Sequence, residues 1–264
     1  MIETPKDDSI RFVGFLDVLG FSAFVSASSH RTVQNVYDGL FGLAPLGLVG
    51  ATTKLVEREN GERFGTPDLG RVDTSLLVIS DSIVVFSDRA DHSGFLKTLA
   101  AVRNLLAVAF YSGLPLRGAV TVGPLSYVPY QVESKATVSI QSLYGKALVD
   151  AKNLEAEQSW SGGVVSDEAV EALKQIVAGP DGPEQVEVSD FIPPELMRRW
   201  QVPVKVDGQI ETEERWAISW PWGNDDRPPN SMVEKAFGMH GKDPAAASEK
   251  IRPTIAFLDG VRPA

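Results

Sequence analysis

Two aspartates in apolar surroundings are the residues of this chain that first suggest chemistry. Asp17 lies inside the run RFVGFLDVLGFSAFV, and Asp81 lies inside the run VISDSIVVF. A buried carboxylate without a partner is costly, and a bound metal ion is one partner that offsets the cost. Two such carboxylates brought close together suit a two-metal site that handles a triphosphate.

The composition limits what kind of metal site the chain can build. The 264 residues include no cysteine and only three histidines, His30, His92 and His240. Thiolate sites are therefore excluded and imidazole sites disfavoured, so oxygen ligands and Mg²⁺ or Mn²⁺ are expected. The formal net charge of −10 argues against a long nucleic-acid partner. A small phosphorylated ligand is compatible with that charge, because a few local cations and a metal can hold it.

The elements that must position the aspartates follow from the hydrophobic pattern. Residues 11 to 19 predict a buried strand, and the apolar spacing in residues 32 to 43 predicts a helix. Residues 75 to 88 predict a hairpin with Asp81 at its tip. A helix then starts at Asp91 or Ser93 and stops at Gly113, and residues 116 to 123 form the next strand. This β-α-β-β-α-β order predicts a ferredoxin-like α+β sheet in which the two aspartates are neighbours.

The rest of the chain is predicted in less detail. Residues 44 to 74 have no clear pattern, and such a long connection is either functional or contains a hairpin. A helix is expected over residues 144 to 158, then a short strand and a helix from about Asp167. Residues 178 to 230 are Pro-rich and irregular apart from the strands VPVKV and RWAISWPW, whose tryptophans suit a core or dimer contact. We expect one domain, residues 1–264, with a core over 8–177 and a C-terminal β/α extension over 178–264.

Four segments resemble the motifs of class III nucleotidyl cyclases. FLDVLGFS resembles the signature F-x-D-[IV]-x-G-F-[TS], and VISDSIVVF resembles the hairpin that carries the second metal aspartate, with Ser80 where a glycine is usual. LRGAVTVG is similar to the R-[IV]-G-[IV]-H-x-G strand, and LYGKALVDAKNLE is similar to the W-G-x-x-V-N-x-A-x-R-L helix. The matches keep the family order from Phe12 to Glu155.

The resemblance implies a role for each matched residue. Asp17, Asp81 and the carbonyl of Val18 would hold two Mn²⁺ or Mg²⁺ ions. The triphosphate would be held by the amides and hydroxyl of the turn that follows, namely Leu19, Gly20, Phe21 and Ser22. In the family, the ribose 3′-oxygen attacks the α-phosphorus and pyrophosphate leaves, so the protein mainly positions groups and stabilises charge.

The chain departs from the family at the base-reading and ribose-reading positions. Leu77 and Ser142 stand where purine cyclases place the side chains that read the base, which disfavours ATP and GTP. Val149 and Asn153 stand where the helix normally carries Asn and Arg, and Asp150 is adjacent. The candidates that replace the missing positive charge are Arg117, which we favour, and Lys135, Lys146 and Lys152.

These departures resemble the bacterial pyrimidine cyclases of Pycsar antiphage systems. That branch implies a cytoplasmic, membrane-free homodimer with composite active sites that makes cyclic UMP from UTP, or cyclic CMP from CTP, and signals to a separate effector. Three alternatives stay open: a purine cyclase, a catalytically inactive module for dimerisation or nucleotide sensing, and a palm-type diguanylate cyclase or polymerase. The last normally carries a Gly-Gly-acid-acid-Phe hairpin, where this chain has SDS.

Overall fold

The computed structural model describes residues 9–49, 53–57, 63–68, 72–132, 138–180, 186–220, 230–239 and 243–261. Its first half contains β1 (Ile10–Val18), α1 (Phe21–Ala27), α2 (His30–Val49), β2 (Thr53–Glu57), β3 (Arg63–Pro67), β4 (Thr74–Ile79), β5 (Ser82–Ser87), α3 (His92–Tyr111) and β6 (Leu116–Pro124). Its second half contains β7 (Ser126–Val132), β8 (Val138–Tyr144), α4 (Lys146–Glu157), β9 (Gly162–Val165), α5 (Asp167–Ala178), β10 (Met197–Val206), β11 (Gln209–Ile218), α6 (Asn230–Gly238) and α7 (Ser248–Gly260).

A seven-stranded sheet organises the fold, with the strand order β10-β11-β9-β6-β1-β5-β4. β1 is antiparallel to both of its neighbours, β5 and β6, whereas β6 and β9 are parallel. The inner order β6-β1-β5-β4 is that of a ferredoxin-like sheet, with helices between β1 and β4 and between β5 and β6. The predicted α+β architecture and its β-α-β-β-α-β core are therefore confirmed.

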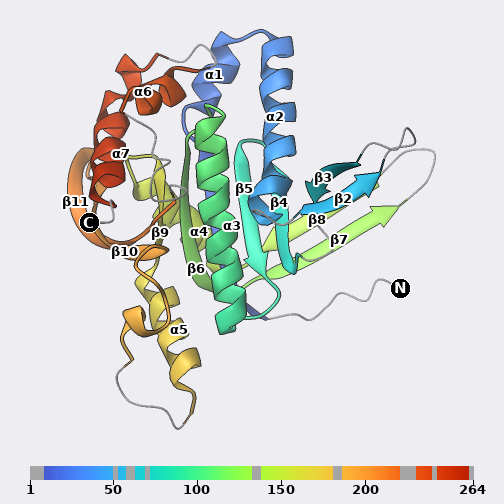
Figure 1. The fold of residues 1–264 in the computed structure, drawn as a ribbon, viewed down its shortest axis with the longest axis vertical. Helices are drawn as coiled ribbons and strands as arrows, with labels where there is room; N and C mark the ends of the chain where they lie inside the picture. The colour runs from blue at the N-terminus through green and yellow to red at the C-terminus, as the bar shows by residue number, and fades with distance from the viewer. Residues whose placement is uncertain are drawn as a thin grey trace.

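The alternating side chains of β1 separate two hydrophobic clusters. Phe12 and Leu16 belong to the large cluster that contains the buried face of α3. Val13 and Phe15 belong to a smaller cluster with Ala147 and Ala151 of α4. Because successive side chains of a strand point to opposite faces, Asp17 projects to the same face as Val13 and Phe15, which is the α4 face. Figure 1 shows α2 and α3 together in front of the central strands.

Helix α3 is a long apolar helix that packs in the core. It is long and apolar enough to span a membrane by length and composition, and 56% of its most apolar window is buried inside the fold. The Asp91 carboxylate accepts a hydrogen bond of 2.7 Å from the Gly94 amide, so Asp91 rather than Ser93 is the cap of the two that the sequence offered. The buried residues of α3 include Phe95, Leu99 and Leu106.

The sequence pattern did not predict α1, the hairpin β7–β8, helix α6 or most of the hairpin β10–β11. The β2–β3 hairpin lies in the segment for which a hairpin was one of two expectations. The β10–β11 hairpin was missed because β11 begins with the exposed, charged run QIETEE, which shows no apolar alternation. Its turn, Asp207–Gly208, has positive φ at both residues and is a strong hairpin signal that could have identified it.

The described tryptophans and the C-terminal helices pack in or against the core. Trp220 is fully buried, as the core interpretation predicted, and Trp216 stacks under Arg199 with the guanidinium carbon 4.3 Å from the ring centroid. Trp222 lies outside the described residues. Phe257 of α7 contacts Trp160 and Trp200, with ring centroids 4.7 and 5.5 Å apart. The same cluster therefore joins this C-terminal helix to the sheet.

Ser80 holds a backbone conformation that favours glycine. It has φ 56° at the first central position of the two-residue β4–β5 turn. We expect Ser80→Gly to raise the free energy of unfolding by about 0.5 kcal/mol, because strain is relieved but unfolded-state entropy is gained. Ser80→Val should lower it by about 1–2 kcal/mol. Urea unfolding measures both, and a Val variant as stable as the wild type would contradict the expectation.

Candidate active site

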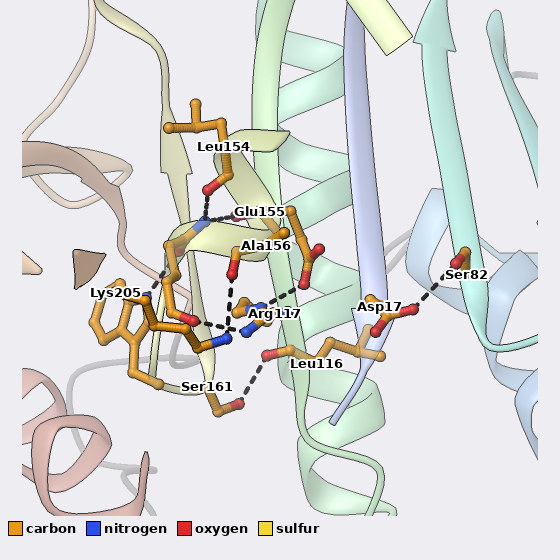
Figure 2. A network of polar contacts seen from close by, with 12 residues as sticks. Asp17, Ser82, Leu116, Arg117, Leu154, Glu155, Ala156, Ser161 and Lys205 are labelled. Atoms are coloured by element: carbon orange, nitrogen blue, oxygen red, sulfur yellow. Dashed lines mark hydrogen bonds and ion pairs between the residues drawn. The ribbon is translucent and has the colours of Figure 1, made fainter. Parts of the chain in front are cut away.

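The ends of β1 and the β4–β5 turn bring Asp17 and Asp81 together. In the sheet, Asp17 is directly opposite Ser82 of β5, and the Ser82 hydroxyl donates a hydrogen bond of 3.0 Å to its Oδ1 (Figure 2). The amide of Val18 donates to the carbonyl of Asp81 over 3.1 Å. Both carboxyl groups are half-buried. The turn is therefore fastened to the end of β1 by its backbone, and the two aspartates face a common region.

The electrostatics of this region favour a bound cation. The pKa of Asp17 is raised to about 6, first because the carboxyl is buried and then because Asp81 and Glu155 place negative charge nearby. The hydrogen bond from Ser82 and the charge of Arg117 oppose the rise only in part. An oxygen donor set with excess negative charge fits Mg²⁺ or Mn²⁺.

The protein would supply few ligands to such a metal site. Among the described residues, no group of three or more His, Cys, Asp or Glu side chains is arranged to hold a metal ion. Asp17 and Asp81 would therefore be the side-chain ligands, with the carbonyl of Val18 as predicted, and the remaining positions would be filled by water and phosphate oxygens. Mg²⁺ in particular usually keeps several waters and binds through one or two carboxylates plus phosphates.

The turn after β1 differs in one respect from the expectation. The amide of Leu19 donates to the carbonyl of Pro115 over 2.9 Å, so it is used inside the fold and the predicted phosphate contact from Leu19 is wrong. Gly20 has φ 73° and an exposed position, and its carbonyl accepts the first helical hydrogen bond of α1, from Phe24. The amides of Gly20, Phe21 and Ser22 lie at this helix start, where N–H groups have no acceptor within the helix.

The two predicted base-reading residues lie on different elements. Leu77 is in β4 opposite Val84, and its side chain packs against the cluster of Val13, Phe15 and Phe86. Ser142 is in β8, next to Leu143, which packs against the same cluster. By strand alternation Ser142 points away from the face that Leu143 buries. The base-reading role of both residues stays a prediction.

Arg117 does not occupy the role that the sequence suggested. It lies directly opposite Asp17 in β6 but is only 8% exposed. Its Nε donates to the Glu155 carboxylate, and its Nη1 donates to the carbonyl of Gln158 over 2.6 Å. A guanidinium that is buried and paired with protein groups is not available as a free cation for a substrate. We therefore correct the expectation that Arg117 supplies the missing positive charge.

Two residues of α4 that the sequence singled out line a cleft that does not include Asp17. Asp150 and Asn153 line a cleft of about 460 Å³ together with residues of α5 and β11, and Asp17 is not part of its lining. Asp150 is ion-paired with Lys146, and Val149 is 56% exposed. Lys152 is exposed, and Lys135 lies outside the described residues. The structure thus brings Asp150 and Asn153 together in one cleft, whose lining includes neither Asp17 nor Asp81.

Sequence reasoning missed three residues near the site. Ser82 and Glu155 contact Asp17 and Arg117 respectively, and the first could have been suspected from its place beside Asp81. Lys250 of α7 lines a cavity of about 500 Å³ whose lining also includes Leu19 and Gly20. No sequence signal links Lys250 to this turn, because more than two hundred residues separate them and only the packing of α7 brings them together.

Comparisons with known proteins gave similarity only at the level of structure. No family profile and no curated relative matches the sequence. The adenylyl cyclase CyaB from P. aeruginosa is 11% identical with a TM-score of 0.46, covering 79% of this chain and 93% of its own. A guanylate cyclase domain, RhGC from Catenaria anguillulae in complex with GTP, is 13% identical with a TM-score of 0.45, covering 80% and 97%. The catalytic core of a rhodopsin-guanylyl cyclase with converted specificity, in complex with ATPαS, is 12% identical with a TM-score of 0.49, covering 83% and 99%. Similarities this low do not establish an activity or a substrate for this chain.

Proposed function

We propose that this protein is a nucleotidyl cyclase that converts a nucleoside triphosphate to its 3′,5′-cyclic monophosphate and pyrophosphate. The observation that carries the proposal is the aspartate pair. Asp17 and Asp81 meet at adjacent strand ends, and the pKa of Asp17 is raised to about 6 by burial and by neighbouring carboxylates. A purely structural module has no use for two carboxylates held together at a cost.

Each residue of the proposed site would have a separate role in the reaction. Asp17 and Asp81 would hold the metal ions, and Ser82 orients the Asp17 carboxylate through its hydrogen bond. Bound divalent ions would supply charge neutralisation to the phosphates and lower the pKa of the attacking hydroxyl. The amides of Gly20 and Phe21 would orient the triphosphate. The 3′-hydroxyl would lose its proton to solvent as its oxygen forms a bond to the α-phosphorus, the bond from that phosphorus to the bridging oxygen would break, and pyrophosphate would leave with the released charge.

The proposed substrate is UTP, with CTP second. Leu77 offers the base an aliphatic side chain that packs in an apolar cluster, and it cannot donate or accept a hydrogen bond. With Leu77 at one of the two base-reading positions, only the Ser142 hydroxyl could hydrogen-bond to the base there, so the site gains less from the purine edge that cyclases usually read, and this favours a smaller base. ATP or GTP is the alternative outcome, and the solved structures that resemble the fold are named as adenylyl and guanylyl cyclases.

The proposed assembly is a cytoplasmic homodimer with composite sites. Asp150 and Asn153 line a cleft whose lining does not include Asp17, and in the family that the sequence resembles each site combines the aspartates of one chain with this helix of the other. Manganese or magnesium is the proposed cofactor. As in the pyrimidine cyclases that the sequence resembles, the cyclic product would signal to a separate effector in antiphage defence.

A product assay tests the proposal directly. Purified protein is incubated with each of the four ribonucleoside triphosphates and Mn²⁺, and products are separated and identified by mass. We expect cyclic UMP to dominate, with cyclic CMP as the minor product. A cyclic purine product would refute the pyrimidine assignment while keeping the cyclase.

A catalytically inactive nucleotide-sensing module is the second candidate. It is favoured by one observation: the exposed positions of α4 carry Val149 and Asn153 in place of the family's Asn and Arg. In that case no triphosphate yields a cyclic product, while UTP or CTP still binds with Mn²⁺ in a calorimetric titration.

A further inference from the structure

A buried ionic network lies beside Asp17 on the α4 face of the sheet. Arg117 and Asp17 are directly paired residues of the antiparallel strands β6 and β1. Side chains so paired are close enough to interact, and opposite charges in this arrangement attract. Within the described structure, however, no ion pair joins Arg117 to Asp17. The guanidinium is directed to α4 instead, where it meets Glu155 and the carbonyl of Gln158 (Figure 2).

Glu155 is the residue that draws Arg117 away from Asp17. It lies in the last turn of α4 and is 3% exposed. The Nε of Arg117 donates to its carboxylate, and Arg117 is the ion-pair partner that the described structure gives Glu155. The charge of Arg117 still reaches Asp17, because it lowers the pKa of the Asp17 carboxyl. The charge of Arg117 thus acts on both Asp17 and Glu155, but its ion pair is with Glu155.

The end of α4 is fastened so that Glu155 stays in this place. The side chain of Gln158 donates to the carbonyl of Gly118 over 2.9 Å, and Trp160 Nε1 donates to Gln158 Oε1 over 2.8 Å. On the other side, Lys205 of β10 donates to the carbonyl of Ala156 over 3.2 Å. Contacts from both β6 and β10 therefore hold the helix end, and the direction of Arg117 is set by the fold.

We propose that Glu155 is a positioning residue that sequesters Arg117 and so keeps the Asp17 carboxylate free to bind a metal ion. The inference rests on the proposed metal role of Asp17. Without the Glu155 charge, the buried guanidinium still lies opposite Asp17 in the sheet and acts on its carboxyl, and a direct Arg–Asp pair would occupy the oxygens that the metal needs. A simpler reading is that the pair only fastens α4 to β6. That reading predicts lost stability and unchanged metal binding.

The test measures Mn²⁺ binding to full-length, nucleotide-free protein by electron paramagnetic resonance, with thermal unfolding recorded in parallel. Glu155→Gln should bind Mn²⁺ at least tenfold more weakly, because Arg117 turns to Asp17. The double variant Arg117→Met/Glu155→Leu removes the competing guanidinium and replaces the pair by apolar side chains, which buried pairs often tolerate. It should bind Mn²⁺ within threefold of the wild type. Glu157→Gln is the matched control: this half-exposed carboxylate on the same helix pairs with Arg215 at 2.8 Å, and its loss should leave Mn²⁺ affinity unchanged.

Two results would overturn the inference. One is a Glu155→Gln variant that binds Mn²⁺ as tightly as the wild type, and the other is a double variant as weak as the single one. If Glu155→Gln does not fold, Glu155→Asp replaces it, because the shorter carboxylate keeps the charge but reaches Arg117 less well. It should then bind Mn²⁺ at least threefold more weakly, and wild-type affinity would overturn the inference. Wild-type protein that binds no Mn²⁺, or that makes no cyclic nucleotide, would instead count against the proposed function.

Discussion

If the proposed cyclase activity is correct, Asp17→Asn should lower turnover about 100-fold or more while making the folded protein more stable at neutral pH. The amide keeps the shape of the carboxyl but removes the negative charge that would hold a metal ion. Since metal ions supply several kcal/mol of stabilisation in such reactions, we expect turnover to fall about 100-fold or more. Asp81→Asn should cause a similar loss. The measurement is initial rate at saturating Mn²⁺ with the preferred triphosphate.

The stability gain of Asp17→Asn follows from the raised pKa of Asp17. A carboxyl whose pKa is about 6 when folded and 3.8 when unfolded keeps its proton longer in the folded state. Stability from this group is thus fully present below pH 3.8 and is lost as pH rises through about 6. We expect Asp17→Asn to gain about 1 kcal/mol at pH 7.5, after allowing for solvent at this half-buried carboxyl, and nothing near pH 3.5.

The matched control for both effects is Asp73→Asn. Asp73 precedes β4 at the end away from Asp81, and it is ion-paired with Lys97, which lowers the pKa of its carboxyl. Its loss should leave turnover unchanged and should not stabilise the protein. An Asp17→Asn variant that retained near-full activity would show that the site has been misplaced. An Asp17→Asn variant that was inactive but less stable than the wild type at pH 7.5 would support the proposed site. It would contradict only the stability gain that we expect from the raised pKa of Asp17.

Gly145→Ala should be the most destabilising small substitution near the site. Gly145 precedes α4 with φ 153° and ψ 161°, a conformation essentially confined to glycine. A Cβ there would lie 2.2 Å from the carbonyl oxygen of Pro124 and 2.8 Å from the Cα of Leu125, both backbone atoms that cannot swing aside. We expect the free energy of unfolding to fall by about 3 kcal/mol, measured by urea unfolding.

Gly179→Ala separates backbone strain from steric overlap. Gly179 ends α5 with φ 68°, and a Cβ there would meet no atom within 4 Å. Its replacement should cost only about 1 kcal/mol. If Gly145→Ala lowered the free energy of unfolding no more than Gly179→Ala does, the close contact between Gly145 and the backbone of Pro124 would be contradicted. Turnover of Gly145→Ala should also fall, because the start of α4 must shift and Asp150 and Asn153 shift with it.

The core of the fold and the aspartate pair were predictable from the sequence because both depend on local pattern. The continuous apolar run around Asp17 and the two β-branched runs around Asp81 predict three strands, and their order along the chain restricts the sheet to few topologies. Once β1 and β5 are neighbours, a residue ending one and a residue in the turn before the other must meet. The register Asp17↔Ser82 is the result.

The hairpin β10–β11 could not be predicted from apolar alternation. The first six residues of β11 are exposed, so no buried face imposes an apolar alternation on them. Their strand character comes from pairing with β10 through the Asp207–Gly208 turn.

Only the tertiary structure decided what Arg117 does. From the sequence, an arginine at the start of a strand beside the metal site is a candidate cation for the substrate. Its direction depends on Glu155, which is 38 residues away in sequence and is placed by the packing of α4 on β6. The sequence by itself therefore determines which charged residues stand in the strands and helix around Asp17. Which of these charges pair is decided by long-range contacts, because a buried guanidinium pairs with the carboxylate that the fold brings within reach.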